Sequence, residues 1–194
     1  MTARGGDAPL ETRGSEGLAR VSFPLRHRLF RAAWRVTWLL LAAWTPPPLH
    51  GWRRLLLRAF GARVARSARI HGSAEVWYPP NLTMGENAVI GWRVDVYCQA
   101  PITLGDGAIV SQYAQLVAGT HDIDGEGFRL VTRPIHIGER AWVAAGAFVG
   151  PGVTIGEGAV LGARGVAFSD LAPWTVYAGN PARARRRRRR GAGE

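Results

Sequence analysis

A six-residue repeat across residues 137–167 constrains the fold of this chain more than any other feature. The first position of each repeat is apolar and is occupied by Ile137, Val143, Val149, Ile155, Leu161 and Ala167. The second position holds Gly138, Ala144, Gly150, Gly156 and Gly162, and the fifth holds Ala141, Ala147, Val153, Ala159 and Gly165. Three such hexads complete one triangular coil, with the aliphatic side chain inside and small residues at the corners. We therefore predict an all-β fold, a parallel β-helix of hexapeptide repeats.

The length and composition allow one such domain with its own core. The chain has 194 residues and a single cysteine, Cys98, so a disulfide framework is excluded and a reducing compartment fits. Much of the net charge of +11 lies at the C-terminus, where residues 183–190 hold seven arginines in eight positions. That run suits an inert solvated end, an anionic lipid surface or nucleic acid. No aromatic residues are interleaved with the arginines, which argues against a platform for single-stranded nucleic acid.

The chain divides into four predicted regions. Residues 1–19 are polar and glycine-rich, which predicts a disordered leader. A helical cap follows over 20–62, then the β-helix over 63–172 with a loop at 122–136, then a C-terminal segment and Arg-rich tail over 173–194. The apolar run at 36–44 is too short to cross a bilayer, which requires about 20 residues.

Two interpretations of the cap stay open. Residues 24–44 and 50–60 predict helices in which arginines alternate with leucine and tryptophan. The helices can close the open end of the β-helix, which would otherwise expose strand edges, and the pattern favours this. Alternatively, their Trp and Arg side chains lie at a membrane surface near a lipid-linked substrate.

Three interruptions of the repeat fall at one corner of the triangle. The repeat begins at Val64 and restarts at Met84, Leu104 and Ile137, at intervals of 20, 20 and 33 residues against 18 for an unbroken coil. The insertions are therefore two, two and fifteen residues long, and each follows three complete hexads. Loops that leave a rigid scaffold at one place are where sites are usually built.

His121 is the last residue before the longest insertion, and Asp122 follows it. The other histidines have weaker positions: His27 and His50 are in the cap, His71 is inside a hexad, and His136 ends the loop. Position alone leaves a functional and a merely exposed His121 equally open.

Several motifs resemble the sugar O-acetyltransferases of exopolysaccharide biosynthesis, of the colanic acid acetyltransferase type. They are LRAFGA at 57–62, SQYA at 111–114, GTHD at 119–122, FVGPGVTIG at 148–156 and PWTVYAGNPA at 173–182. The resemblance implies a left-handed β-helix and acetyl transfer from acetyl-CoA to a sugar hydroxyl in a ternary complex, with His121 as general base. It requires no nucleophile, and nothing in the sequence pairs Cys98 with a base.

The resemblance also implies a homotrimer with coenzyme A in a groove between neighbouring copies. Trp142 and Ala145 would flank the pantetheine arm, Ala163 would approach it through backbone, and Arg183 and Arg186 would pair with phosphates. Simple repeat filler explains Ala145 and Ala163 equally well. Phe168 and Ser169 depart from the family pattern, which has Thr and Lys there.

Asp95 and Tyr97, one coil before His121, are the candidate acceptor residues, since both can hydrogen-bond sugar hydroxyls. The alternative is a pair of outward-facing strand residues on a trimer surface. The acceptor sugar and its hydroxyl stay open.

The expected location is the cytoplasm, with peripheral contact at the inner face of the membrane through the N-terminal helices and the Arg tail. Neither a metal nor a nucleic acid partner is expected. Two rivals remain: a non-enzymatic, membrane-associated trimeric scaffold, and a carbonic anhydrase-like metal enzyme that needs three converging histidines.

Overall fold

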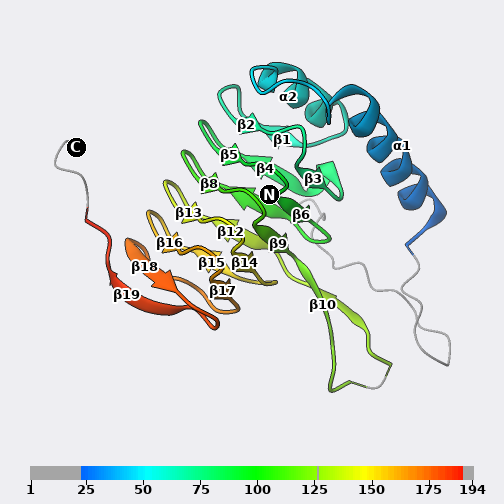
Figure 1. The fold of residues 1–194 in the computed structure, drawn as a ribbon. Coiled ribbons are helices and arrows are strands. Elements are labelled where there is room, and N and C mark those ends of the chain that lie inside the picture. The colour runs from blue at the N-terminus through cyan, green and yellow to red at the C-terminus, as the bar shows by residue number, and fades with distance from the viewer. Residues whose placement is uncertain (1–22, 126, 190–194) are drawn as a thin grey trace, which may run out of the picture.

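Three parallel sheets form the sides of a triangular prism in the computed structural model, which describes residues 23–125 and 127–189 (Figure 1). The first sheet contains β1 (Arg63–Val64), β4 (Leu82–Met84), β7 (Ile102–Leu104), β12 (Ile135–Ile137) and β15 (Thr154–Ile155). The second contains β2 (Arg69–Ile70), β5 (Val89–Ile90), β8 (Ile109–Val110), β13 (Trp142–Val143) and β16 (Val160–Leu161). The third contains β3 (Glu75–Val76), β6 (Asp95–Tyr97), β9 (Gln115–Val117), β14 (Phe148–Val149) and β17 (Val166–Ala167).

The core consists of stacked hexad positions. In the second sheet the in-register inward residues are fully buried: Ile70, Ile90, Val110, Val143 and Leu161. Their outward neighbours are more exposed, as alternation along a strand requires. The predicted fold class, a left-handed parallel β-helix with an N-terminal helical cap, is confirmed.

All three interruptions lie between the third and first sheets, at one corner, as the repeat predicts. The first contains the 3₁₀ helix η1 (Pro79–Asn81), and the second joins β6 to β7. The third is an antiparallel hairpin of β10 (Gly119–His121) and β11 (Leu130–Thr132). This differs from a loop over 122–136, because the hairpin starts earlier and Ile135 returns to the first sheet, where it is buried beside Ile102.

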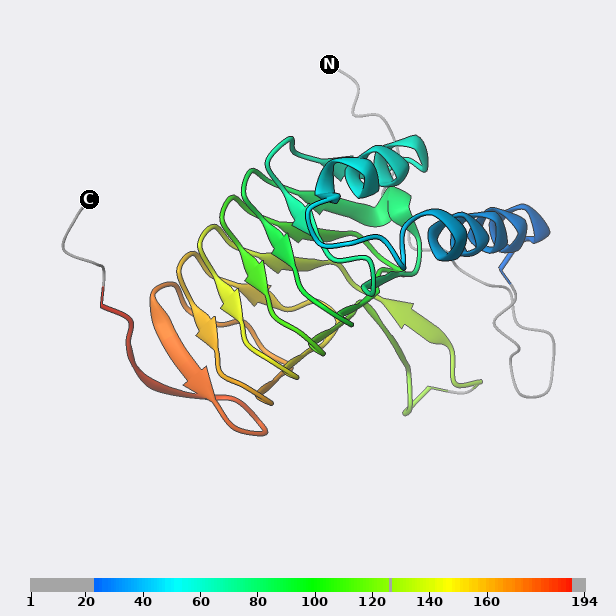
Figure 2. The ribbon, with the colours of Figure 1, turned by 45° about the horizontal axis from the view of Figure 1, so that its top comes forward.

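The cap consists of α1 (Leu25–Leu41) and α2 (His50–Ala59), which close the first coil (Figure 2). The indole N–H groups of Trp34 and Trp38 donate to the carbonyls of Val76 and Gly72 at 2.7 and 2.9 Å. The fully buried Arg53 of α2 donates to carbonyls that include Ile70, at 2.8 Å. These bonds fix both helices to the β-helix.

At the opposite end, β18 (Thr175–Ala178) extends the second sheet and pairs with the antiparallel β19 (Arg183–Arg187). The first part of the Arg-rich run is therefore a strand with exposed side chains. The sequence interpretation had included an inert solvated end for this run. The predicted leader at 1–19 lies outside the described residues. No helix in the described part of the chain is long and apolar enough to span a membrane.

Candidate active site

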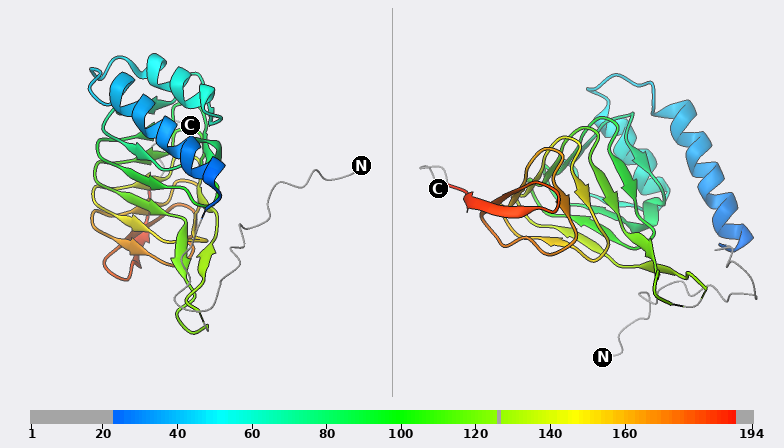
Figure 3. Two further views of the ribbon diagram at one scale, coloured as in Figure 1. Left: turned by 90° about the vertical axis from the view of Figure 1, so that its right-hand side faces the viewer. Right: turned by 60° about the horizontal axis from the view of Figure 1, so that its bottom comes forward.

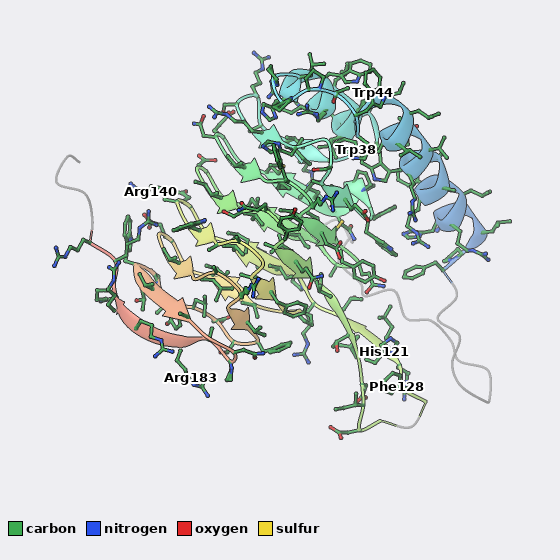
Figure 4. All side chains as sticks on the ribbon, in the orientation of Figure 1. Trp38, Trp44, His121, Phe128, Arg140 and Arg183 are labelled. Atoms are coloured by element: carbon green, nitrogen blue, oxygen red, sulfur yellow. The ribbon has the colours of Figure 1, made fainter. Side chains whose placement is uncertain are left out.

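His121 is the last residue of β10, on the hairpin that projects from the prism (Figure 4). Its Nδ1 is 2.9 Å from the carbonyl oxygen of Phe128, and the two rings stack with centroids 4.7 Å apart and an interplanar angle of 14°. Phe128 has a φ of 48°, in the left-handed region, which follows the tight turn at Gly127. Because a carbonyl can only accept, Nδ1 carries the proton and Nε2 keeps its lone pair.

The neighbouring carboxylate does not hold the imidazole. Asp122 accepts the backbone N–H of Gly125 at 3.1 Å through Oδ1, which closes the turn of the hairpin. The imidazole is held instead by the backbone carbonyl of Phe128.

A cavity of about 430 Å³ opens beside His121. Its walls come from the hairpin, the ends of the third-sheet strands and the start of α1, and its lining residues are Phe23, Arg31, Trp77, Tyr97, Gln99, Gly119, Thr120, His121 and Leu130. Tyr97 therefore shares the cavity with His121, whereas Asp95 is not in its lining. A hollow with aromatic walls and a few polar groups suits a sugar.

Arg31 is a cavity residue that the sequence interpretation missed. Its guanidinium lies over the Trp77 ring, 4.2 Å from the centroid, and its Nε is buried without a hydrogen-bond partner in the described structure. Burial lowers the pKa of Arg31. Its place is set by the packing of α1 on the first coil, since the buried Trp34 lies one helical turn further on.

Asp95 lies opposite Glu75 in the β3–β6 ladder. Burial, and then the neighbouring Glu75 carboxylate, raise the pKa of Asp95. The like charges on directly opposed residues oppose strand pairing.

The candidate donor residues cluster away from His121. Trp142 lies in the second sheet and donates its indole N–H to Ser111 Oγ at 2.9 Å. Ala145 and Ala163 lie in stacked turns of consecutive coils, linked by the Arg164 N–H to the Ala145 carbonyl at 2.9 Å. These turns join the second sheet to the third, whereas the hairpin leaves the corner between the third and the first.

The remaining donor candidates, Arg183 and Arg186, lie in β19, and Figure 4 shows Arg183 well apart from His121. One chain therefore does not bring the donor candidates to the imidazole.

Cys98 is fully buried, and burial raises the pKa of its thiol to about 12. Its Sγ donates to the Tyr78 carbonyl at 3.2 Å and accepts the Tyr78 N–H at 3.3 Å. A protonated, enclosed thiol cannot act as an acyl carrier. Within the described residues no group of three His, Cys, Asp or Glu side chains is placed to hold a metal ion.

A triangular β-helix of hexads with an imidazole at its interrupted corner defines the class of hexapeptide-repeat transferases. Residues 134–166 match the family model for the bacterial transferase hexapeptide, and residues 82–111 match that for the hexapeptide repeat of succinyl-transferase. The chain is 41% identical over 149 residues to WcaF of Escherichia coli (strain K12), which is named for acetyl transfer in colanic acid biosynthesis. The matched residues make up 77% of this chain and 82% of WcaF. This chain therefore belongs to the hexapeptide-repeat acetyltransferases of the colanic acid type.

Solved structures share the fold. A galactoside acetyltransferase in complex with coenzyme A has a TM-score of 0.77 at 23% identity, over 86% of this chain and 84% of that one. The acetyltransferase VCA0836 from Vibrio cholerae, complexed with acetyl coenzyme A, has a TM-score of 0.74 at 23% identity, over 86% and 91%.

Proposed function

We propose that this protein transfers the acetyl group of acetyl-CoA to a sugar hydroxyl during exopolysaccharide biosynthesis, with His121 as general base. The observation that carries the proposal is the His121 Nδ1 bond to the Phe128 carbonyl, beside an aromatic-walled cavity. That bond leaves Nε2 as the only ring atom that can accept a proton. The relationship to an acetyltransferase named for colanic acid biosynthesis supports the sugar acceptor.

The chemistry needs no covalent enzyme intermediate. Nε2 takes the proton of the sugar hydroxyl while the hydroxyl oxygen attacks the thioester carbonyl carbon of acetyl-CoA, and a new C–O bond forms. The C–S bond then breaks, and the imidazolium returns the proton to the departing thiolate. Trp77 and Tyr97 offer faces against which a sugar ring can pack.

The donor would lie between two copies of the chain. Ala145 and Ala163 give a surface with small side chains that a thin pantetheine arm can follow, the exposed Trp142 can flank that arm, and Arg183 and Arg186 supply cations for phosphates. We expect a homotrimer to bring this surface of one copy against the His121 hairpin of the next. The cytoplasm is the proposed location.

The decisive experiment compares His121→Ala with His136→Ala. The enzyme is supplied with acetyl-CoA and a panel of free, nucleotide-linked and lipid-linked sugars, and acetylated products are detected by mass spectrometry. His121→Ala should lower kcat by roughly 10²–10⁴-fold with an unchanged oligomer, because proton abstraction is lost. His136 is an exposed strand residue, so its substitution should leave the rate within about twofold. A full rate in His121→Ala would exclude the proposed mechanism.

A further inference from the structure

Helix α1 has two apolar faces, and the β-helix covers only one of them. The inner face carries Trp34 and Trp38, both buried on the first coil. The opposite face presents an exposed stripe at helical spacing: Leu25, Leu29, Ala32, Val36, Leu39 and Leu40. Leu25, Leu39 and Val36 are 67%, 63% and 55% exposed. A surface helix of a soluble domain normally has polar residues on that side.

The stripe continues beyond the end of the helix. Trp44 is 73% exposed in the following turn, and Trp52 and Leu55 of α2 are also exposed. Figure 3 shows α1 lying across the end of the β-helix, with no other drawn helix or strand on its outer side. A continuous apolar surface of this kind marks an interaction site.

The charges around the stripe have one sign. Residues 23–74 contain ten arginines and neither aspartate nor glutamate. By helical geometry, Arg28 and Arg35 border one side of the stripe and Arg26 the other. Long basic side chains can extend their charged ends from an apolar surface toward anionic headgroups.

We propose that the outer face of α1 binds the surface of a bilayer that contains anionic phospholipid, with the helix lying in the plane of the membrane. The helix has 17 residues, or about 26 Å at 1.5 Å per residue, and arginines divide its apolar surface. An in-plane helix with an apolar face and basic edges fits the charge and the shape of this surface. Trp44 and Trp52 would lie at headgroup depth.

The binding surface lies close to the cavity beside His121. Phe23 and Arg31, from α1 and the residues just before it, line that cavity. No described carboxylate forms an ion pair with Arg31, so its guanidinium can meet a phosphate. This placement favours an acceptor sugar that is carried on a lipid phosphate, an inference that rests on the proposed function.

Vesicle flotation of the full chain tests the proposal. The probes are phosphatidylcholine vesicles with and without phosphatidylglycerol, at low and high salt. Wild-type protein should float with the anionic vesicles, and less at high salt because charge attraction is screened. The double variant Leu29→Asn with Val36→Asn should bind roughly tenfold or more weakly, since two apolar side chains no longer enter the bilayer.

Phe168→Asn is the matched control, because Phe168 is 68% exposed and follows β17, near the other end of the prism. It should float like wild type. The proposal would be overturned if the wild-type protein does not float, or if the double variant floats equally well. It would also be overturned if the double variant loses its oligomeric state without vesicles, because α1 would then be a protein interface. Flotation is scored without acetyl transfer, and the double variant should keep the wild-type rate on a soluble acceptor, so failure of either proposal is recognised separately.

Discussion

At the scale of the residue, one backbone carbonyl determines what His121 can do. The carbonyl of Phe128 fixes the tautomer, and the Phe128 ring stacks on the imidazole and restricts its rotation. Phe128 is itself half exposed, so its contact with His121 contributes more to orientation than to the core. Positioning by a hairpin rather than by a carboxylate makes the reactivity of His121 depend on the shape of the turn.

Phe128→Ala should therefore lower kcat by roughly tenfold while the KM for acetyl-CoA stays unchanged, because an imidazole without the stacked ring is less restricted and less often aligned, although the backbone carbonyl remains. Phe128→Tyr, which keeps the stacked ring, should recover most of the rate. Steady-state kinetics of the two variants provide the check. Equal rates in Phe128→Ala and wild type would show that the Phe128 ring does not orient His121.

The sequence singles out His121 as a candidate but does not predict its surroundings. Its position before the longest insertion distinguishes it from the other histidines, whereas its role as general base is implied by the resemblance and stays a prediction. Arg31 was not predicted as a cavity residue, since it lies among several arginines in a helix and only the packing of α1 on the first coil turns it inward. The Phe128 carbonyl has no side-chain signal at all.

At the scale of the element, the β3–β6 ladder carries an unfavourable pair. Glu75 faces Asp95, and the pKa of Asp95 is raised by burial first and by Glu75 second. A carboxyl with a raised folded-state pKa gives stability that is fully present below its unfolded pKa and is lost as pH rises through the folded value. The pair therefore weakens the fold at neutral pH.

Asp95→Asn should raise the free energy of unfolding at pH 7 by about 0.5–1 kcal/mol, because the opposed like charges are removed. The difference from wild type should vanish at acid pH, where Asp95 is protonated. Chemical denaturation at several pH values measures both effects. Asp106→Asn is the control and should lower the free energy of unfolding, since the Asp106 carboxylate accepts the Glu86 N–H at 2.7 Å. Destabilisation by Asp95→Asn at every pH would contradict this account, and a raised acceptor KM would assign Asp95 to sugar binding.

The elements themselves followed largely from the sequence, because a strict hexad leaves one inward position per strand and one place for each corner. The hairpin was harder to predict. Residues 119–121 and 130–132 pair with each other outside the prism, and that pairing obeys no hexad. The in-register burial of Ile135 beside Ile102 then sets where the repeat resumes.

At the scale of the whole molecule, the two halves of the proposed site are separated within one chain. The hairpin that carries His121 projects from the corner between the third and first sheets, whereas Ala145 and Ala163 lie at the corner between the second and third. A closed ring of copies can bring one corner against the other, with each copy giving its base to one site and its donor surface to the next. Neither the repeat nor the monomer structure contains that contact, so it stays a prediction.

Complementation between two inactive variants tests this central claim most directly. His121→Ala removes the base, and Ala163→Trp obstructs the donor surface; each variant alone should form trimers without acetyl transfer. After coexpression in equal amounts, about one site in three in mixed trimers, or about one in four over all trimers, should combine an intact His121 with an intact donor surface, restoring about a quarter of the wild-type rate. Trimers that contain both variants and show no acetyl transfer would contradict a site shared between copies.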